Sequence, residues 1–193
     1  MLFLILNSLI GSSQIPEANN PEKHPYQINK WFVDSLDNKP ISFYLNHPNI
    51  DKYSKLFYEG KFAASDDDLT FAFLDSVLTK NTETKSFYLF IYNSVLRITD
   101  GALSEYMGYN CRKYLEKYPC SFINLKNNKL YANNYQSWID FSAYEYYNEE
   151  YPIEIVKEEF ELIRIAVNDR CEDNSTELEY ILLRIVEFVN ENK

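Results

Sequence analysis

Residues Ser86–Leu96, SFYLFIYNSVL, decide the fold class of this chain. The segment carries no charge, and at helical spacing its apolar side chains occur on every side. A helix that is apolar all round is buried between other elements. The run FYLFIY also fits a buried strand, because aromatic residues suit sheet packing and short apolar runs have no decisive period. We expect a helix, because the apolar character continues through Ile98, farther than most strands run.

The segments next to this helix carry start and stop signals for two more helices. Ser65–Asp68 precede an apolar run, where carboxylates can accept the free N–H groups of a helix start. These aspartates could also hold a cation, but the Gly and the terminal Glu of a calcium loop do not follow. Asp100-Gly101 ends the central helix and begins the next, over residues 102–118. Gly108 within it indicates the close approach of a neighbouring helix, because glycine costs about 1 kcal/mol there relative to alanine.

Apolar stripes at helical spacing predict the remaining helices. The last helix also has the capping-box spacing of Thr176 and Glu179. The stripes are Ile28, Trp31, Phe32 and Leu36 in a helix over 26–36; Tyr131, Tyr135 and Trp138 in 130–147; Val156, Phe160, Ile163 and Val167 after Pro152; and Leu178, Ile181, Leu182, Ile185 and Val189. Residues 40–45 and 51–58 add short turns of helix. We therefore predict one all-α domain over 26–193, with about six to eight helices and room for a short strand pair near Phe87 or Leu130.

The N-terminal segment is typical of export. Residues 1–10, MLFLILNSLI, are apolar and uncharged, and small residues follow in Gly11-Ser12-Ser13. This pattern predicts a signal peptide over 1–13, although no basic residue precedes the apolar run. The alternative is a buried first helix. Residues 14–25 contain three prolines and predict an extended lead-in. We expect a periplasmic or extracellular protein without an integral membrane segment after signal removal.

Three cysteines are the second indicator of compartment. Export permits disulfides, and we expect Cys171 to pair with either Cys111 or Cys120, or all three thiols to be buried and reduced. Nine helical residues would separate Cys111 from Cys120 by about 13 Å, too far for a bridge. Asn174-Ser175-Thr176 forms a glycosylation triplet, which would matter only in a eukaryotic cell.

The sequence lacks the motifs of most catalytic classes. Four glycines form no phosphate-binding loop and no nucleophile elbow, and neither H-E-x-x-H nor C-x-x-C occurs. His24 and His47 both precede proline, which predicts surface turns. A carboxylate pair stays possible, with Glu105 and Asp140 as the acids most embedded in apolar sequence, although both fit an exposed helix surface. We expect no metal and no cofactor, and an enzyme is the less favoured class.

Charge distribution is the feature that points to a function. Residues 145–193 carry 14 acidic and 5 basic side chains, whereas residues 1–144 carry 15 and 14. Such a region repels nucleic acid and attracts a basic protein surface. A solvated helix face is the other explanation of the acids, and core packing is the other explanation of the tyrosines. The predicted partner-binding residues are Glu150, Glu154, Glu158, Glu161, Tyr144, Tyr147 and Tyr151.

These observations favour an exported, non-enzymatic binding protein of the inhibitor or immunity type, which covers a basic site on its partner. The alternatives are an exported helical hydrolase with a carboxylate pair and a structural domain of an envelope assembly. The sequence leaves the partner's identity and the oligomeric state open.

Overall fold

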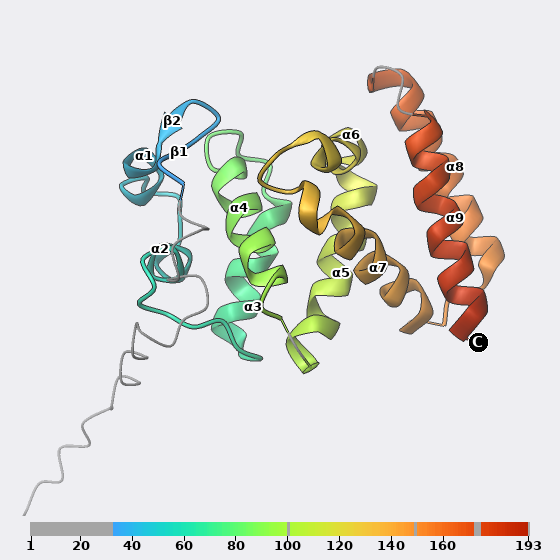
Figure 1. Ribbon diagram of the computed structural model, residues 1–193, viewed down its shortest axis with the longest axis horizontal. Coiled ribbons are helices and arrows are strands. Elements are labelled where there is room, and N and C mark those ends of the chain that lie inside the picture. The colour runs from blue at the N-terminus through green and yellow to red at the C-terminus, as the bar shows by residue number, and fades with distance from the viewer. Residues whose placement is uncertain (1–32, 100, 149, 172–174, 193) are drawn as a thin grey trace, which may run out of the picture.

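Helices make up most of the computed structural model, which describes residues 33–99, 101–148, 150–171 and 175–192. The predicted signal peptide and lead-in lie outside these residues. The described residues form nine α-helices, three 3-10 helices and one strand pair, so the all-α prediction is confirmed. Figure 1 shows the elements in chain order, from α1 (Ile41–Leu45) at one end to α8 (Ile153–Arg170) and α9 (Ser175–Asn192) at the other.

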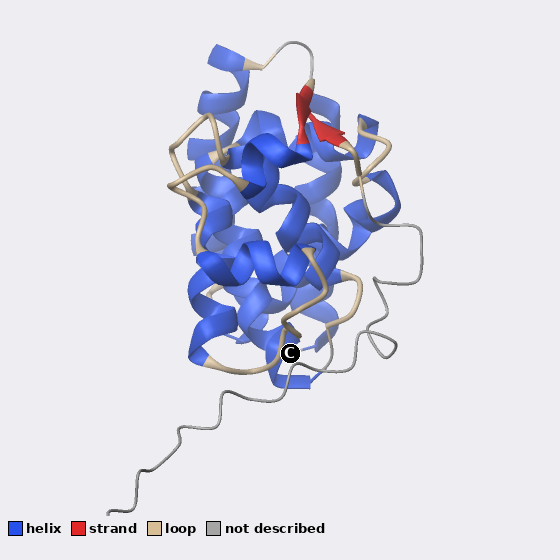
Figure 2. Ribbon diagram, turned by 90° about the vertical axis from the view of Figure 1, so that its left-hand side faces the viewer, coloured by secondary structure: helices blue, strands red, loops and turns tan. Residues whose placement is uncertain are grey.

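The strand pair lies at the N-terminal end, at the edge of an otherwise helical molecule (Figure 2). β1 (Ser35–Leu36) pairs with β2 (Lys39–Pro40) in antiparallel register. Asp37 and Asn38 join them with φ values of 47° and 61°, the left-handed backbone that a two-residue hairpin turn requires. The predicted helix over 26–36 is therefore wrong at its described end. A short strand pair is present, as the fold prediction allowed, but it lies here and not near Phe87 or Leu130. The local turn preference of Asp37-Asn38 prevails over the helical spacing of Leu36.

Two short helices begin at aspartate caps, and the sequence predicted the cap of the second. Asp51 accepts a hydrogen bond of 2.8 Å from the backbone N–H of Ser54 at the start of α2 (Lys52–Tyr58). Asp67 does the same for Thr70, also at 2.8 Å, at the start of α3 (Asp68–Leu74). The hydrogen bond at Asp67 confirms the capping role predicted for the Ser65–Asp68 segment. The cap leaves one fewer unpaired N–H donor at the start of the helix.

The central segment is a helix, as predicted, and not a strand. α4 (Lys85–Leu96) follows the 3-10 helix η3 (Asp75–Leu78). Nine of its twelve residues are buried, including the polar Asn93 and Ser94. Asn93 Oδ1 accepts a hydrogen bond of 3.2 Å from the indole N–H of Trp138. The buried amide is thereby satisfied, which is the condition for placing a polar group in a core.

Trp138 lies at the centre of the aromatic core. It belongs to α7 (Tyr135–Asn148), and its ring centroid lies 4.8 Å from Tyr92 of α4 and 5.3 Å from Tyr114 of α5 (Gly101–Lys117). Phe122 of α6 (Pro119–Ile123) packs edge-on against it at 5.9 Å. Rings at such distances add about 0.5–1.5 kcal/mol per pair beyond the area they bury. One tryptophan therefore joins four helices.

Gly108 allows α5 and α7 to approach closely, as the sequence indicated. A Cβ atom at this position would lie 3.1 Å from the backbone oxygen of Phe141 and 3.3 Å from Oε2 of Glu145. The first of these neighbours is backbone, which cannot rotate aside. The glycine thus suits the short distance between the two helices, since a Cβ here would make its neighbours shift by a few tenths of an ångström.

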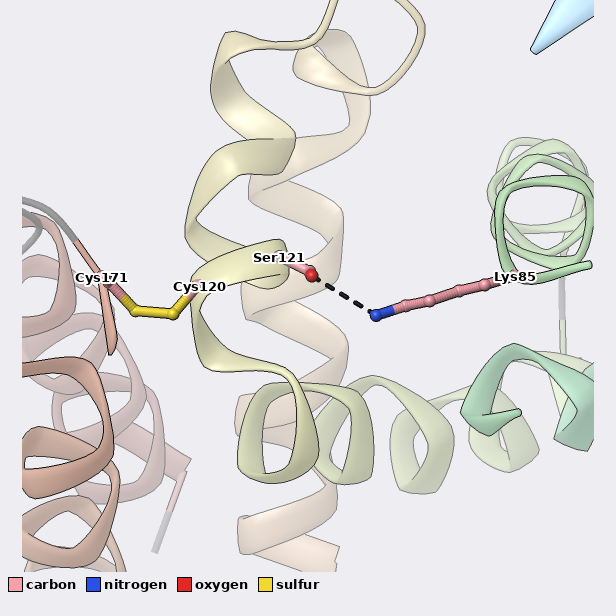
Figure 3. Close-up of a disulfide and its surroundings, with 4 residues drawn as sticks. All are labelled: Lys85, Cys120, Ser121 and Cys171. Carbon is pink, nitrogen blue, oxygen red and sulfur yellow. Dashed lines mark hydrogen bonds between the residues drawn. A yellow bond between two sulfur atoms is a disulfide. The ribbon is translucent and has the colours of Figure 1, made fainter. Parts of the chain in front are cut away.

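A disulfide ties the last two helices to the rest of the molecule. Cys120 of α6 is bonded to Cys171, which follows α8, with their Cα atoms 5.5 Å apart (Figure 3). Of the two pairings expected for Cys171, the structure has this one. Cys111 is a buried thiol, and burial raises its pKa, so it stays protonated beside the hydroxyl of Tyr92.

The C-terminal helices α8 and α9 bury the predicted stripes. Val156, Phe160, Ile163 and Val167 are all buried, and so are Leu178, Ile181, Leu182, Ile185 and Val189. The capping box is wrong, because α9 begins at Ser175, which places Thr176 inside the helix. Glu179 instead accepts hydrogen bonds of 2.6 and 2.7 Å from Arg164 of α8. α7 also begins later than predicted, after the 3-10 helices η4 (Asn124–Asn127) and η5 (Ala132–Asn134).

The close approach at Gly108 predicts the effect of Gly108→Ala. Helix propensity alone would stabilise the variant by about 1 kcal/mol. Overpacking against the Phe141 carbonyl costs about 1–3 kcal/mol, so we expect a net loss of roughly 1 kcal/mol in the free energy of unfolding. Urea unfolding measures it, with Asn168→Ala, an exposed helix position, as the control that reports propensity alone. A Gly108→Ala variant more stable than the wild type would contradict the prediction.

Candidate functional site

The outer face of α8 combines acidic and apolar side chains, and all of them are exposed. Glu154, Glu158 and Glu161 lie at spacings of four and three residues, on the side opposite the buried stripe. The same side of the helix exposes three large apolar residues: Ile155 by 37% of its surface, Leu162 by 70% and Ile165 by 59%. We call these six residues the α8 face. Single exposed apolar residues are ordinary, but three large ones on one helix among carboxylates form a patch of the kind used in binding.

The α8 face points outward because a buried arginine fixes the other side of the helix. Only 5% of the Arg112 side chain, on α5, is exposed. Its guanidinium forms ion pairs with Glu159 of α8, at 3.0 Å, and with Glu116, at 2.8 Å. Its guanidinium lies 4.6 Å from the ring centroid of Tyr146 and 4.3 Å from that of Tyr151. Nothing in the sequence around Arg112 distinguished it from a surface residue.

Arg112 and Tyr146 of this network both keep their protons at neutral pH. Burial lowers the pKa of Arg112, but contacts with Tyr151, Tyr146 and the two glutamates more than offset it, and the net shift is upward. Burial also raises the pKa of Tyr146, and the nearby Glu159 carboxylate raises it further. Tyr146 therefore stays protonated and donates a hydrogen bond of 2.9 Å to Glu159. The network is a structural clamp between α5, α7 and α8.

The predicted tyrosines do not join the α8 face. Tyr151 covers Arg112, and Tyr147 packs edge-on against Phe188 of α9, with ring centroids 6.3 Å apart. These two tyrosines and Tyr144, the third on the predicted list, are half-buried. Glu150 is exposed but lies before α8 with a φ of 53°, so it does not continue the helical stripe of Glu154. Core packing, the alternative interpretation, explains most of their surface.

Three of the four predicted residues that lie off the α8 face line two pockets, and the fourth, Tyr151, covers Arg112. Tyr147 and Glu150 line a pocket of about 530 Å³ together with Asn148 and Asn192. Tyr144 lines another, of about 360 Å³, between α5, α7 and α9. The structure thus divides the predicted partner site into one helix face and two hollows.

The second pocket also contains both carboxylates that the sequence singled out. Its walls are formed by residues from three helices: Ser104, Glu105, Asp140, Phe141, Tyr144 and Phe188. Glu105 and Asp140 are exposed, which agrees with their expected place on a helix surface. Asp140 accepts a hydrogen bond of 2.8 Å from Gln136 one turn earlier. Sequence alone did not indicate that residues 35 positions apart would line one pocket.

His47 is the site residue on which the sequence was misleading. It lies in a turn, as predicted, but only 9% of it is exposed. Its Nε2 lies 3.4 Å from a carboxylate oxygen of Glu83, and its Nδ1 accepts a hydrogen bond from the backbone N–H of Asn49. Phe43 packs against the ring at 5.4 Å. Tertiary contacts therefore bury a turn that the sequence predicted to be exposed. The other histidine, His24, and Asn174 of the glycosylation triplet lie outside the described residues.

The described residues form neither a metal-binding cluster nor a membrane-spanning helix. No group of three or more His, Cys, Asp or Glu side chains there is placed to hold a metal ion. Within the same part of the chain, each helix is too short or too polar to cross a membrane.

Comparisons with protein-family models, with curated proteins and with solved structures find no match. The functional argument therefore depends on the geometry of the chain itself.

Removal of the buried arginine should destabilise the fold. Arg112→Met leaves Glu159 and Glu116 without their shared cation, and breaking a buried pair costs about 3–5 kcal/mol. The control is Lys113→Met, which removes a half-exposed cation from the same Glu116 and should cost under about 1 kcal/mol. Chemical denaturation measures both. Equal losses would show that Arg112 does not act as a clamp.

Proposed function

We propose that the protein is an exported, non-enzymatic binding protein of the inhibitor or immunity type, and that the α8 face contacts a basic partner. The observation that carries the proposal is the exposure of Leu162 and Ile165 among Glu154, Glu158 and Glu161. Burying two large aliphatic side chains supplies affinity, and carboxylates around them supply orientation and fast association.

The chemistry of the face selects the kind of partner. A complementary surface has an apolar centre and Lys or Arg side chains around it. Glu154 and Glu158 form no ion pair with the described residues, so both stay available to an incoming cation. Glu161 is partly neutralised, because it pairs with Arg164. A second copy of the chain or a nucleic acid would bring like charges together, which costs several kcal/mol at an interface.

The disulfide supports the proposal of export. Bridges such as Cys120–Cys171 form and persist in oxidising compartments and are rare in reducing ones. The bridge joins α6 to the end of α8, so it also holds the proposed binding helix in place. A fixed helix loses less conformational entropy on binding than a mobile one.

A carboxylate-pair hydrolase is the second candidate, favoured by one observation: Glu105 and Asp140 line the same pocket. A catalytic acid, however, works best in a water-poor, apolar setting that keeps it protonated. Both carboxylates are exposed, so the pocket offers little of that environment. The binding proposal therefore has the stronger support.

Charge reversal on α8 tests the proposed interface. The probe is an 18-residue amphipathic peptide with Leu on one helix face and Lys on the other. Glu154→Lys, Glu158→Lys and Glu161→Lys together should weaken binding at least tenfold at low salt, because like charges then face the peptide. Fluorescence anisotropy in rising salt measures the dissociation constant.

The matched control reverses three exposed acids on the N-terminal half, Asp34, Glu59 and Asp66, which changes the net charge equally. We expect less than a threefold effect. Equal weakening by both triple variants would mean that net charge, and not the α8 face, attracts the peptide. Leu162→Ser with Ile165→Ser isolates the apolar contribution and should weaken binding even at high salt.

The hydrolase alternative makes a different prediction. If Glu105 and Asp140 were an acid–base pair, hydrolysis of chromogenic glycosides would fall at least a hundredfold in Glu105→Gln or Asp140→Asn. Under the binding proposal we expect no hydrolysis by the wild type to begin with. Turnover that both variants abolish would replace the binding proposal with the hydrolase.

A further inference from the structure

The pocket between α5, α7 and α9 has the composition of a site for an organic cation. Three rings, Phe141, Tyr144 and Phe188, form its apolar walls, and the carboxylates of Glu105 and Asp140 lie in the same lining. Its volume of about 360 Å³ falls in the range of small-molecule sites, about 300–1,000 Å³. Neither acid forms an ion pair with the described residues, so the negative charge of the pocket is not neutralised within them.

The rings are held in place by packing outside the pocket. Tyr147 lies between two of them, with its centroid 6.4 Å from Tyr144 and 6.3 Å from Phe188. The backbone at Phe141 is fixed by the close approach of Gly108. Gln136 donates to one carboxylate oxygen of Asp140, which orients the group. These supports limit the freedom that a ligand would have to remove.

We propose that this pocket binds an organic ammonium group carried on a short apolar stem. The ring faces attract a cation through their quadrupoles, and the two carboxylates attract it by charge. An anion is excluded by the same carboxylates, and a neutral apolar molecule gains nothing from them. The shared chemistry has two sources: a free amine of the choline type, or a lysine side chain of a protein. The inference stands on the pocket alone and does not depend on the α8 face.

The test compares a cation with its neutral isostere. Choline and 3,3-dimethylbutan-1-ol have the same shape and differ in the charge. We expect choline to shift the amide NMR signals of Tyr144 and Phe188 with a dissociation constant in the low millimolar range. The neutral alcohol should bind at least tenfold more weakly. Equal binding of both compounds would overturn the proposal, because the pocket would then be only an apolar hollow.

Variants locate the binding and separate the two contributions. Glu105→Gln with Asp140→Asn should weaken choline binding at least fivefold. Because both side chains are exposed, we expect the fold to be retained. Phe188→Leu keeps apolar volume but removes a ring face, and should weaken choline more than the alcohol. The control is Asp66→Asn, an exposed position before α3 and outside the pocket lining, which should leave both affinities unchanged. Weakening by the control equal to that of the pocket variants would overturn the proposal.

A second titration identifies the source of the cation. Nα-acetyl-lysine methylamide stands in for a lysine side chain of a partner. Binding tighter than that of choline would assign the pocket to a protein side chain, and weaker binding would assign it to a free quaternary amine. Binding of neither cation, in a protein whose thermal unfolding is unchanged, would overturn the proposal.

Discussion

The close approach of α5 and α7 at Gly108 is the contact on which the rest of this structure depends. One turn before Gly108, Ser104 and Glu105 reach the pocket that Asp140, Phe141 and Tyr144 line from α7. One turn after it, Arg112 reaches Tyr146 of α7 and Glu159 of α8. A side chain at position 108 would separate the two helices, because its Cβ would meet the Phe141 carbonyl at 3.1 Å. The pocket and the clamp thus depend on the same interhelical distance, which links two features that have no residue in common.

Two different kinds of bond orient α8 on this pair of helices. The Arg112 network acts in the folded state, since a buried guanidinium with two carboxylates and two rings fits one geometry only. The Cys120–Cys171 bridge acts mainly on the unfolded chain, and closing a loop with a sequence separation of 51 removes about 4 kcal/mol of chain entropy there. Both restraints lie on the inner side or the end of α8. Neither restraint uses the outer side of α8, where Glu161 pairs with Arg164 and three aliphatic side chains are exposed.

The sequence predicted features that depend on the residues of one helix, such as its buried side and its cap. It did not predict contacts between two elements that lie far apart in the sequence. The stripe Val156, Phe160, Ile163 and Val167 was correct because its spacing records which side of a single helix is buried. The Asp67 cap was correct because capping involves residues three apart. Arg112 was missed, and His47 was placed on the surface, because their partners lie 47 and 36 positions away. That Glu105 and Asp140 line one pocket could not be predicted for the same reason. The hairpin at Asp37-Asn38 is different: its signal was local, and the helical spacing around it obscured it.

The charge asymmetry of the chain is the strongest argument that its surface is functional. Carboxylates without cationic neighbours repel one another and oppose folding, so a purely structural helix is expected to interleave both signs. α9 partly does so, with Arg184 beside Glu187, and Arg164 joins Glu161 to Glu179 across the two helices. Glu154 and Glu158 on the α8 face, and Glu105 and Asp140 in the pocket, form no ion pair with the described residues, although Lys157 lies between the first two in the sequence. Each pair lies beside exposed or half-buried apolar side chains. A ligand that combines a cation with an apolar group complements both places, so the two proposed ligands share one chemistry although they bind at different sites.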